Sequence, residues 1–182
     1  MIQYYDNLAK IFSRGENALF HAAAKQKYFG LISLSPIASD KEKANAASLQ
    51  LLSTLAVPKE SSSDIQDDMF TKRKVNRLTS LLNFNRAPTR DSLLEQIETL
   101  NTLKTADPVL VEFYNLLENK FHPLDFNTKS KAALSKISST PEYKPYTNDL
   151  LNVILDKLFL QVSEVYETIK LDFLVKLATF ED

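Results

Sequence analysis

Six cations lie close together in residues 69–90 with no acidic residue among them, and they are the side chains best placed to do chemistry. They are Lys72, Arg73, Lys74, Arg77, Arg86 and Arg90. Lysine and arginine attract phosphate groups, and a local excess of them is typical of surfaces that bind nucleic acid. Two interpretations stay open: a basic patch that contacts RNA phosphates or an acidic partner, and a solvated helix face that balances the acidic segment 59–68.

Arg90 differs from the other five cations because it lies at the expected start of a helix. Unpaired N–H groups and the helix dipole favour anions at that position, so a cation there needs compensation. Asp91 and Glu95 are close enough in sequence to supply it, and so is a bound phosphate. Local compensation is the interpretation we favour.

No other set of residues predicts a catalytic or metal site. The chain has no cysteine, and its two histidines, His21 and His122, lie far apart and outside any H-E-x-x-H pattern. The acidic pairs 67–68 and 181–182 lack a third oxygen donor at the spacing of a calcium loop. No serine occupies a nucleophile elbow. We therefore expect no catalytic residue, no metal, no cofactor and no small-molecule substrate.

Composition narrows the fold class and the compartment. The chain of 182 residues has two glycines, whereas average usage gives about 13, so hairpin-rich folds and glycine-rich phosphate loops are disfavoured. The net charge of −1 gives no general preference for nucleic acid. No apolar run approaches about 18 residues, and the first residues do not resemble a signal peptide. We expect a cytoplasmic protein without a membrane partner.

Apolar residues recur at intervals of three and four along most of the chain, which predicts helices and almost no strand. The seven prolines fall between these segments or at their starts. Ser39 and Glu42 form a capping-box pattern, and Asp107 precedes a proline at a first helical turn. The expected helices lie near residues 4–12, 19–29, 39–55, 75–82, 89–100, 108–121, 127–137, 150–166 and 171–180.

The apolar spacing also predicts which way the cations of the fourth helix point. Val75, Leu78 and Leu82 form its apolar stripe, so Arg73 and Arg77 project from another face. Short connections between nine helices predict antiparallel pairs that stack as a solenoid.

Several short motifs follow one another in a fixed order along the chain. Between residues 77 and 124 they are Arg77-Leu78, Leu81-Leu82, Ala87-Pro88-Thr89-Arg90, Tyr114-x-x-Leu117-Glu118 and Phe121-x-Pro123-Leu124. Upstream is Ala47-Ser48-Leu49 with residues 51–58, and downstream are Gln161-Val162-Ser163 and Val165-Tyr166. Together, over most of residues 45–180, they resemble the PCI-domain family found in the largest subunit of eukaryotic translation initiation factor 3.

The resemblance implies an all-α fold, a right-handed superhelical array of antiparallel helix pairs like TPR and HEAT repeats, followed by a winged helix. On this basis residues 1–166 form the helical-repeat part of a PCI domain, and 167–182 form the first helix of an incomplete winged helix.

The resemblance also implies a non-enzymatic scaffold in the factor that loads mRNA onto the small ribosomal subunit. Its expected partners are other subunits of the factor (the c subunit through its PCI domain), mRNA or rRNA, and the small ribosomal subunit. Two alternatives stay open: a PCI scaffold subunit of the proteasome lid or COP9 signalosome, and a helical enzyme for which we find no candidate residues.

Overall fold

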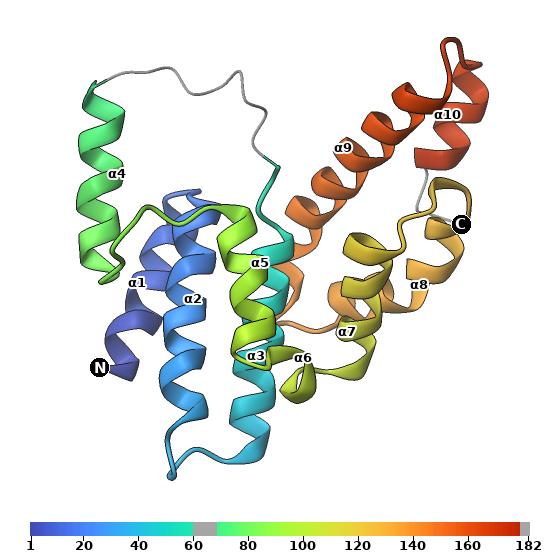
Figure 1. Ribbon diagram of the computed structural model, residues 1–182. Helices are drawn as coiled ribbons and strands as arrows, with labels where there is room; N and C mark the ends of the chain where they lie inside the picture. Colours follow the sequence, from blue (N-terminus) through green and yellow to red (C-terminus); the bar gives the residue numbers. More distant parts are fainter. Residues whose placement is uncertain (60–68, 179–182) are drawn as a thin grey trace. The chain divides into compact units, whose positions relative to one another are not determined.

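A computed structural model of the chain describes residues 1–59 and 69–178, and every regular element in these ranges is a helix (Figure 1). The α-helices are α1 (Ile2–Arg14), α2 (Ala18–Ser33), α3 (Asp40–Leu55), α4 (Met69–Leu81), α5 (Arg90–Thr99), α6 (Thr102–Thr105), α7 (Pro108–Tyr114), α8 (Pro123–Ser139), α9 (Thr147–Val165) and α10 (Leu171–Ala178). A π-helix, η1 (Asn115–Asn119), and a 3₁₀ helix, η2 (Lys144–Tyr146), complete the order. The predicted all-α class is confirmed.

The chain forms two compact units, Met1–Asp107 and Pro108–Asp182. The boundary that we predicted at residues 166 and 167 does not coincide with this division and stays a prediction. The acidic segment 59–68 lies outside the described residues except for Lys59, as does the end of the last predicted helix. No helix in the described ranges has the length and apolar content that a bilayer crossing needs.

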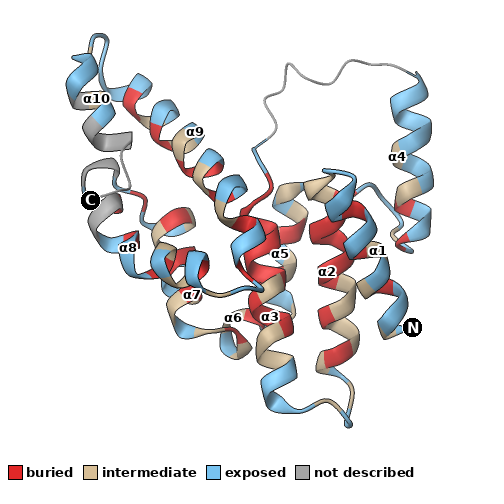
Figure 2. Cartoon of the chain, turned by 180° about the vertical axis from the view of Figure 1, so that it is seen from behind, coloured by how far each residue is buried: buried red, intermediate tan, exposed pale blue. Residues whose placement is uncertain are grey.

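Helix α2 is at the centre of the first unit, with α1, α3 and α5 packed against it. Its consecutive residues Ala22, Ala23 and Ala24 are fully buried, which is possible because helices cover α2 on several sides (Figure 2). Small side chains let neighbouring helices approach closely and exclude water from their contact. Helices α5 and α6 pack against α3 and extend this core.

Side-chain caps fix where helices begin in the first unit. Ser39 and Glu42 form the predicted capping box at the start of α3, with the Ser39 N–H donating to Glu42 Oε2 at 2.8 Å. Asn17 caps α2 through its side-chain oxygen. Helix α1 ends at Gly15, which has a φ of −87°. The left-handed conformation falls on Glu16, with a φ of 53°.

Helix α4 docks onto the core through its apolar stripe and its C-terminal end. Val75 and Leu78 are partly buried against the core cluster, and Leu82, just after the helix, is fully buried. The Tyr4 hydroxyl donates to the Leu81 carbonyl at 3.0 Å. The predicted orientation of this helix is therefore confirmed.

The second unit is built around aromatic and leucine side chains of α7, α8 and α9. Phe126 lies 4.8 Å from Phe121 and 6.2 Å from Phe113 between ring centroids, and Leu150 and Ile154 are fully buried. Helix α8 begins at Pro123, a turn earlier than predicted. Tyr143 and Tyr146 are buried in this unit, whereas Tyr166 is 44% exposed.

Three helical elements were not predicted: α6, η1 and η2. The predicted helix 108–121 changes from α to π geometry at Asn115. Lys157 of α9 donates to the carbonyl of Leu117 inside this π segment and lies 3.7 Å from the Glu118 carboxylate. This contact joins residues 40 positions apart in the sequence, so local spacing could not indicate it.

Candidate nucleic-acid interface

Four of the six candidate cations lie on α4, and all four are exposed: Lys72, Arg73, Lys74 and Arg77. Figure 2 shows the helix exposed along most of its length. Because Val75 and Leu78 face the core, the cations must project into solvent. An exposed face that carries four positive charges and no acid can contact successive phosphate groups.

Arg86 and Arg90 lie outside α4 in different settings. Arg86 is exposed in the segment that joins α4 to α5, and Arg90 is partly buried as the first residue of α5. Arg90 Nε donates to the Val57 carbonyl at 3.0 Å. Val57 follows the end of α3, where the last carbonyls carry partial negative charge, and this compensates a cation at the start of α5.

Compensation of Arg90 by Asp91 or Glu95 stays a prediction, since the contact that the structure gives is with the Val57 carbonyl, a partner that sequence reasoning missed. It comes from a segment 33 residues away, and nothing in its residue type indicates the contact. The guanidinium therefore joins the start of α5 to the end of α3, and Arg90 stays a candidate for RNA contact only as a prediction.

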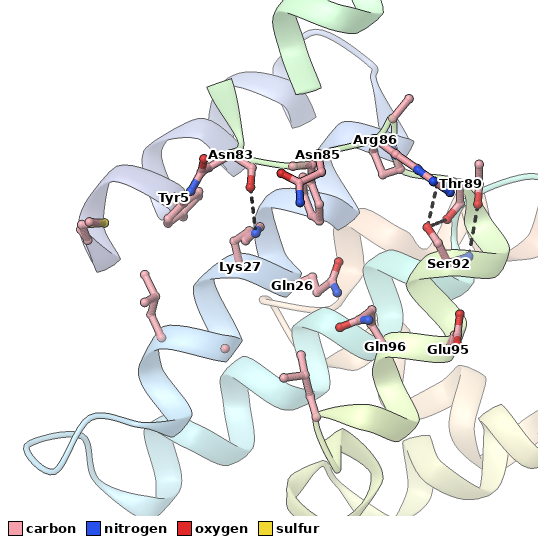
Figure 3. Close-up of a pocket in the computed structure, with 17 residues that line it drawn as sticks. Tyr5, Gln26, Lys27, Asn83, Asn85, Arg86, Thr89, Ser92, Glu95 and Gln96 are labelled. Atoms are coloured by element: carbon pink, nitrogen blue, oxygen red, sulfur yellow. Dashed lines mark hydrogen bonds between the residues drawn. The ribbon is translucent and has the colours of Figure 1, made fainter. Parts of the chain in front are cut away.

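A groove of about 990 Å³ lies beside this segment, within the first unit. Helix α2 contributes Gln26, Lys27 and Gly30, helix α5 contributes Ser92, Glu95 and Gln96, and residues 83–89 cover one side (Figure 3). Arg86 is the one candidate cation that lines it in the described part of the chain. Sequence reasoning missed the other polar residues because they are scattered over three segments without a common pattern.

Lys27 has the most unusual electrostatic setting in the groove. Its Nζ donates to the Asn83 carbonyl at 3.2 Å and lies 4.2 Å from the centroid of the Phe84 ring. Burial lowers the pKa of Lys27 below the ordinary value of a lysine. Asn83 itself is left-handed, with a φ of 55°, which turns the chain after α4 over the groove.

The histidines have structural settings. His21 is buried, and its Nδ1 donates to the Ala9 carbonyl at 2.7 Å, which joins α2 to α1. His122 is exposed at the residue before α8. Over residues 1–59 and 69–178, no three acidic, histidine or cysteine side chains are grouped so as to hold a metal ion.

Comparison with known proteins gives a consistent result. A family model described as "eIF3a, PCI domain, TPR-like region" matches residues 1–125. The chain is 44% identical over 182 residues to a protein from Yarrowia lipolytica named as the A subunit of eukaryotic translation initiation factor 3, covering 99% of this chain and 18% of that protein. Proteins of the same name from Aspergillus terreus and Mycosarcoma maydis are each 39% identical, over 100% and 98% of this chain and 19% of their own lengths. The chain thus spans about a fifth of the length of the curated relatives it matches.

Proposed function

The chain belongs to the PCI-domain family of the A subunit of eukaryotic translation initiation factor 3, and from this premise we propose that it is a non-enzymatic scaffold in translation initiation. In this role it joins other subunits of the factor, the c subunit through its PCI domain among them, and helps recruit mRNA and the small ribosomal subunit in the cytoplasm. The names of the relatives favour this assembly over the proteasome lid and the COP9 signalosome.

We propose that the α4 face contacts RNA, either mRNA or ribosomal RNA, through Lys72, Arg73, Lys74 and Arg77, with Arg86 and Arg90 as further candidates. The observation that carries this proposal is the exposure of all four α4 cations while Val75 and Leu78 pack inward. Since no acid occurs in residues 69–90, the patch has no internal neutralising charge. Phosphate contacts of this kind give binding that weakens as salt concentration rises.

The test is a variant in which Lys72, Arg73, Lys74 and Arg77 are all replaced by alanine. Binding of a fluorescent single-stranded RNA is measured by anisotropy at several salt concentrations. We expect weaker binding, and we expect the slope of log K against log salt to fall by about 0.7 for each phosphate group that the variant no longer neutralises. Recruitment of mRNA in a reconstituted initiation system should weaken in parallel.

The matched control replaces four exposed lysines elsewhere, Lys41, Lys104, Lys120 and Lys144, by alanine. It changes the net charge by the same amount, so it separates the α4 patch from the total charge of the chain. If the α4 variant stays folded and binds RNA with the same affinity and salt slope as the control, the proposed interface is wrong.

A further inference from the structure

The groove between α2, α5 and residues 83–89 contains a buried acceptor without a partner. Gln26 is 5% exposed, and its Oε1 accepts no hydrogen bond from any described residue. A buried acceptor in that condition costs about 1–3 kcal/mol unless a donor reaches it. Gln26 from α2 and Gln96 from α5 point toward one another across the groove (Figure 3). This is the arrangement expected where a ligand supplies the missing donor.

Gly30 gives the groove its depth on the α2 side. A Cβ atom added to Gly30 meets no atom within 4 Å, so the space above this turn of the helix is open. A glycine inside a helix is less stable than alanine by about 0.5–1 kcal/mol, and here it leaves backbone accessible to a ligand.

The charges that line the groove favour an acidic ligand. Lys27 and Arg86 form no ion pair with any residue in 1–59 or 69–178, and Glu95 is the one acidic side chain of the lining. A carboxylate placed near Lys27 restores the pKa that burial has lowered, since an opposite charge favours the ammonium form.

The remaining lining favours a peptide over RNA. Side-chain amides offer both donors and acceptors, which match the N–H and C=O groups of an extended main chain. Leu31 and Leu100 add apolar surface for its side chains. The groove offers no open ring for base stacking, because Lys27 covers the ring of Phe84 and Tyr5 is 7% exposed.

We propose that this groove binds an extended peptide segment of a partner protein, with a main-chain N–H donating to Gln26 Oε1 and acidic side chains meeting Lys27 and Arg86. This site is distinct from the α4 patch, and the inference does not depend on RNA binding.

The test selects phage-displayed random 12-residue peptides on the 182-residue chain and measures the affinity of synthetic copies by anisotropy. We expect the selected peptides to share an aspartate or glutamate. Gly30→Leu, which fills the open space, should weaken their binding at least tenfold, and so should Arg86→Glu. Replacing the shared acid by its amide should have a similar effect.

Two matched variants serve as controls. Gly15→Leu alters the other glycine, which is exposed and lies outside the groove. Arg14→Glu reverses the charge of an exposed arginine that also lies outside the groove. Both should bind the peptides as the unaltered chain does. Circular dichroism and thermal unfolding check that each variant folds. If Gly30→Leu does not fold, the exposed Arg86→Glu change decides the test.

Three results overturn the inference. One is a selection that yields no peptide binding more tightly than about 1 mM. Another is peptide binding that is unchanged by Gly30→Leu or Arg86→Glu in a folded chain. The third is loss of RNA binding in Gly30→Leu, which assigns the groove to RNA. The quadruple α4 variant should lose RNA binding and retain peptide binding, so failure of one proposal is distinguishable from failure of the other.

Discussion

Asp6 joins the first two helices through two lysines. Lys10 Nζ lies 2.6 Å from one carboxylate oxygen, and Lys25 Nζ of α2 lies 3.3 Å from the other. Burial by itself raises the pKa of Asp6, but the hydrogen bonds and charges of Lys10 and Lys25 outweigh it, so the pKa lies below the ordinary value. Lys25 is 9% exposed. Its ammonium group is therefore largely removed from water and depends on the carboxylate of Asp6.

Asp6→Asn should destabilise the protein by about 1–3 kcal/mol at pH 7, because it leaves the buried Lys25 ammonium without its carboxylate. A carboxyl group whose folded pKa is depressed contributes stability that is fully present above its unfolded pKa, about 3.9. That stability is lost as the pH falls through the folded value. Urea unfolding should therefore show the difference between the two proteins shrinking below about pH 4.

Asp156→Asn is the control for this prediction, since Asp156 is an exposed acid on α9. It should change stability by less than about 0.5 kcal/mol at either pH. An equal destabilisation by both variants, or one from Asp6→Asn that persists unchanged at low pH, contradicts the assigned role.

At the residue scale, the sequence predicts the exposure of a side chain correctly where residues of the same helix decide it. The exposure of Arg73 and Arg77 followed from the spacing of Val75 and Leu78. The sequence did not indicate Gln26 as a candidate binding residue. Gln26 stands out only because no described residue donates a hydrogen bond to its Oε1. That absence is a property of the packed chain and leaves no trace in the residues beside Gln26.

At the scale of elements, two adjacent leucines at the C-terminal end of α4 differ in how much they contribute to its position. Leu82 is fully buried in the core cluster, whereas the preceding Leu81 is 48% exposed. The two side chains are identical in chemistry and adjacent in sequence, so their difference in burial isolates the packing contribution.

Leu82→Ala should cost about 2–5 kcal/mol of unfolding free energy, because removal of a buried side chain loses its transfer free energy and leaves a cavity. Leu81→Ala should cost about 0.5 kcal/mol or less. Urea unfolding monitored by circular dichroism measures both. Comparable destabilisation in the two variants would show that α4 does not dock through Leu82.

Helix boundaries were predictable to the extent that caps decide them. Ser39 and Glu42 start α3, and Pro108 starts α7, as their residue types indicate. The π segment at Asn115 was not predictable, because its Leu117 carbonyl is held by Lys157 from another helix. Element types therefore follow from local pattern, while departures from regular geometry follow from contacts distant in sequence.

At the scale of the whole molecule, the first compact unit ends at Asp107. Its last residues are tied to α3 by two contacts. Thr102 Oγ1 donates to Gln50 Oε1 at 3.0 Å, and the Asp107 N–H donates to Ser48 Oγ at 3.0 Å. Three of these side chains are at most 1% exposed: Thr102, Gln50 and Ser48. Because water does not reach them, their polar groups rely on these contacts for hydrogen bonds.

We expect a fragment of residues 1–107 to unfold cooperatively, since it contains a contiguous core of its own. A fragment of residues 1–100 should be less stable by at least about 2 kcal/mol, because Gln50 and Ser48 lose partners in a buried setting. Urea unfolding by circular dichroism compares the two. Thr102→Val in the longer fragment removes the hydrogen bond to Gln50 without shortening the chain. Equal stability of the two fragments and this variant would contradict a stabilising role for the contacts with α3.

The sequence by itself determined the helical class, the outward direction of Arg73 and Arg77 and the starts of several helices. These depend on residues within about four positions of one another, where helical geometry is fixed by the backbone. Only the tertiary structure decided that Arg90 meets Val57, that Gln26 is buried without a donor from the described residues, and that α2, α5 and residues 83–89 enclose a groove. Such features arise from the packing of distant segments, and their free energies depend on burial that no local pattern specifies.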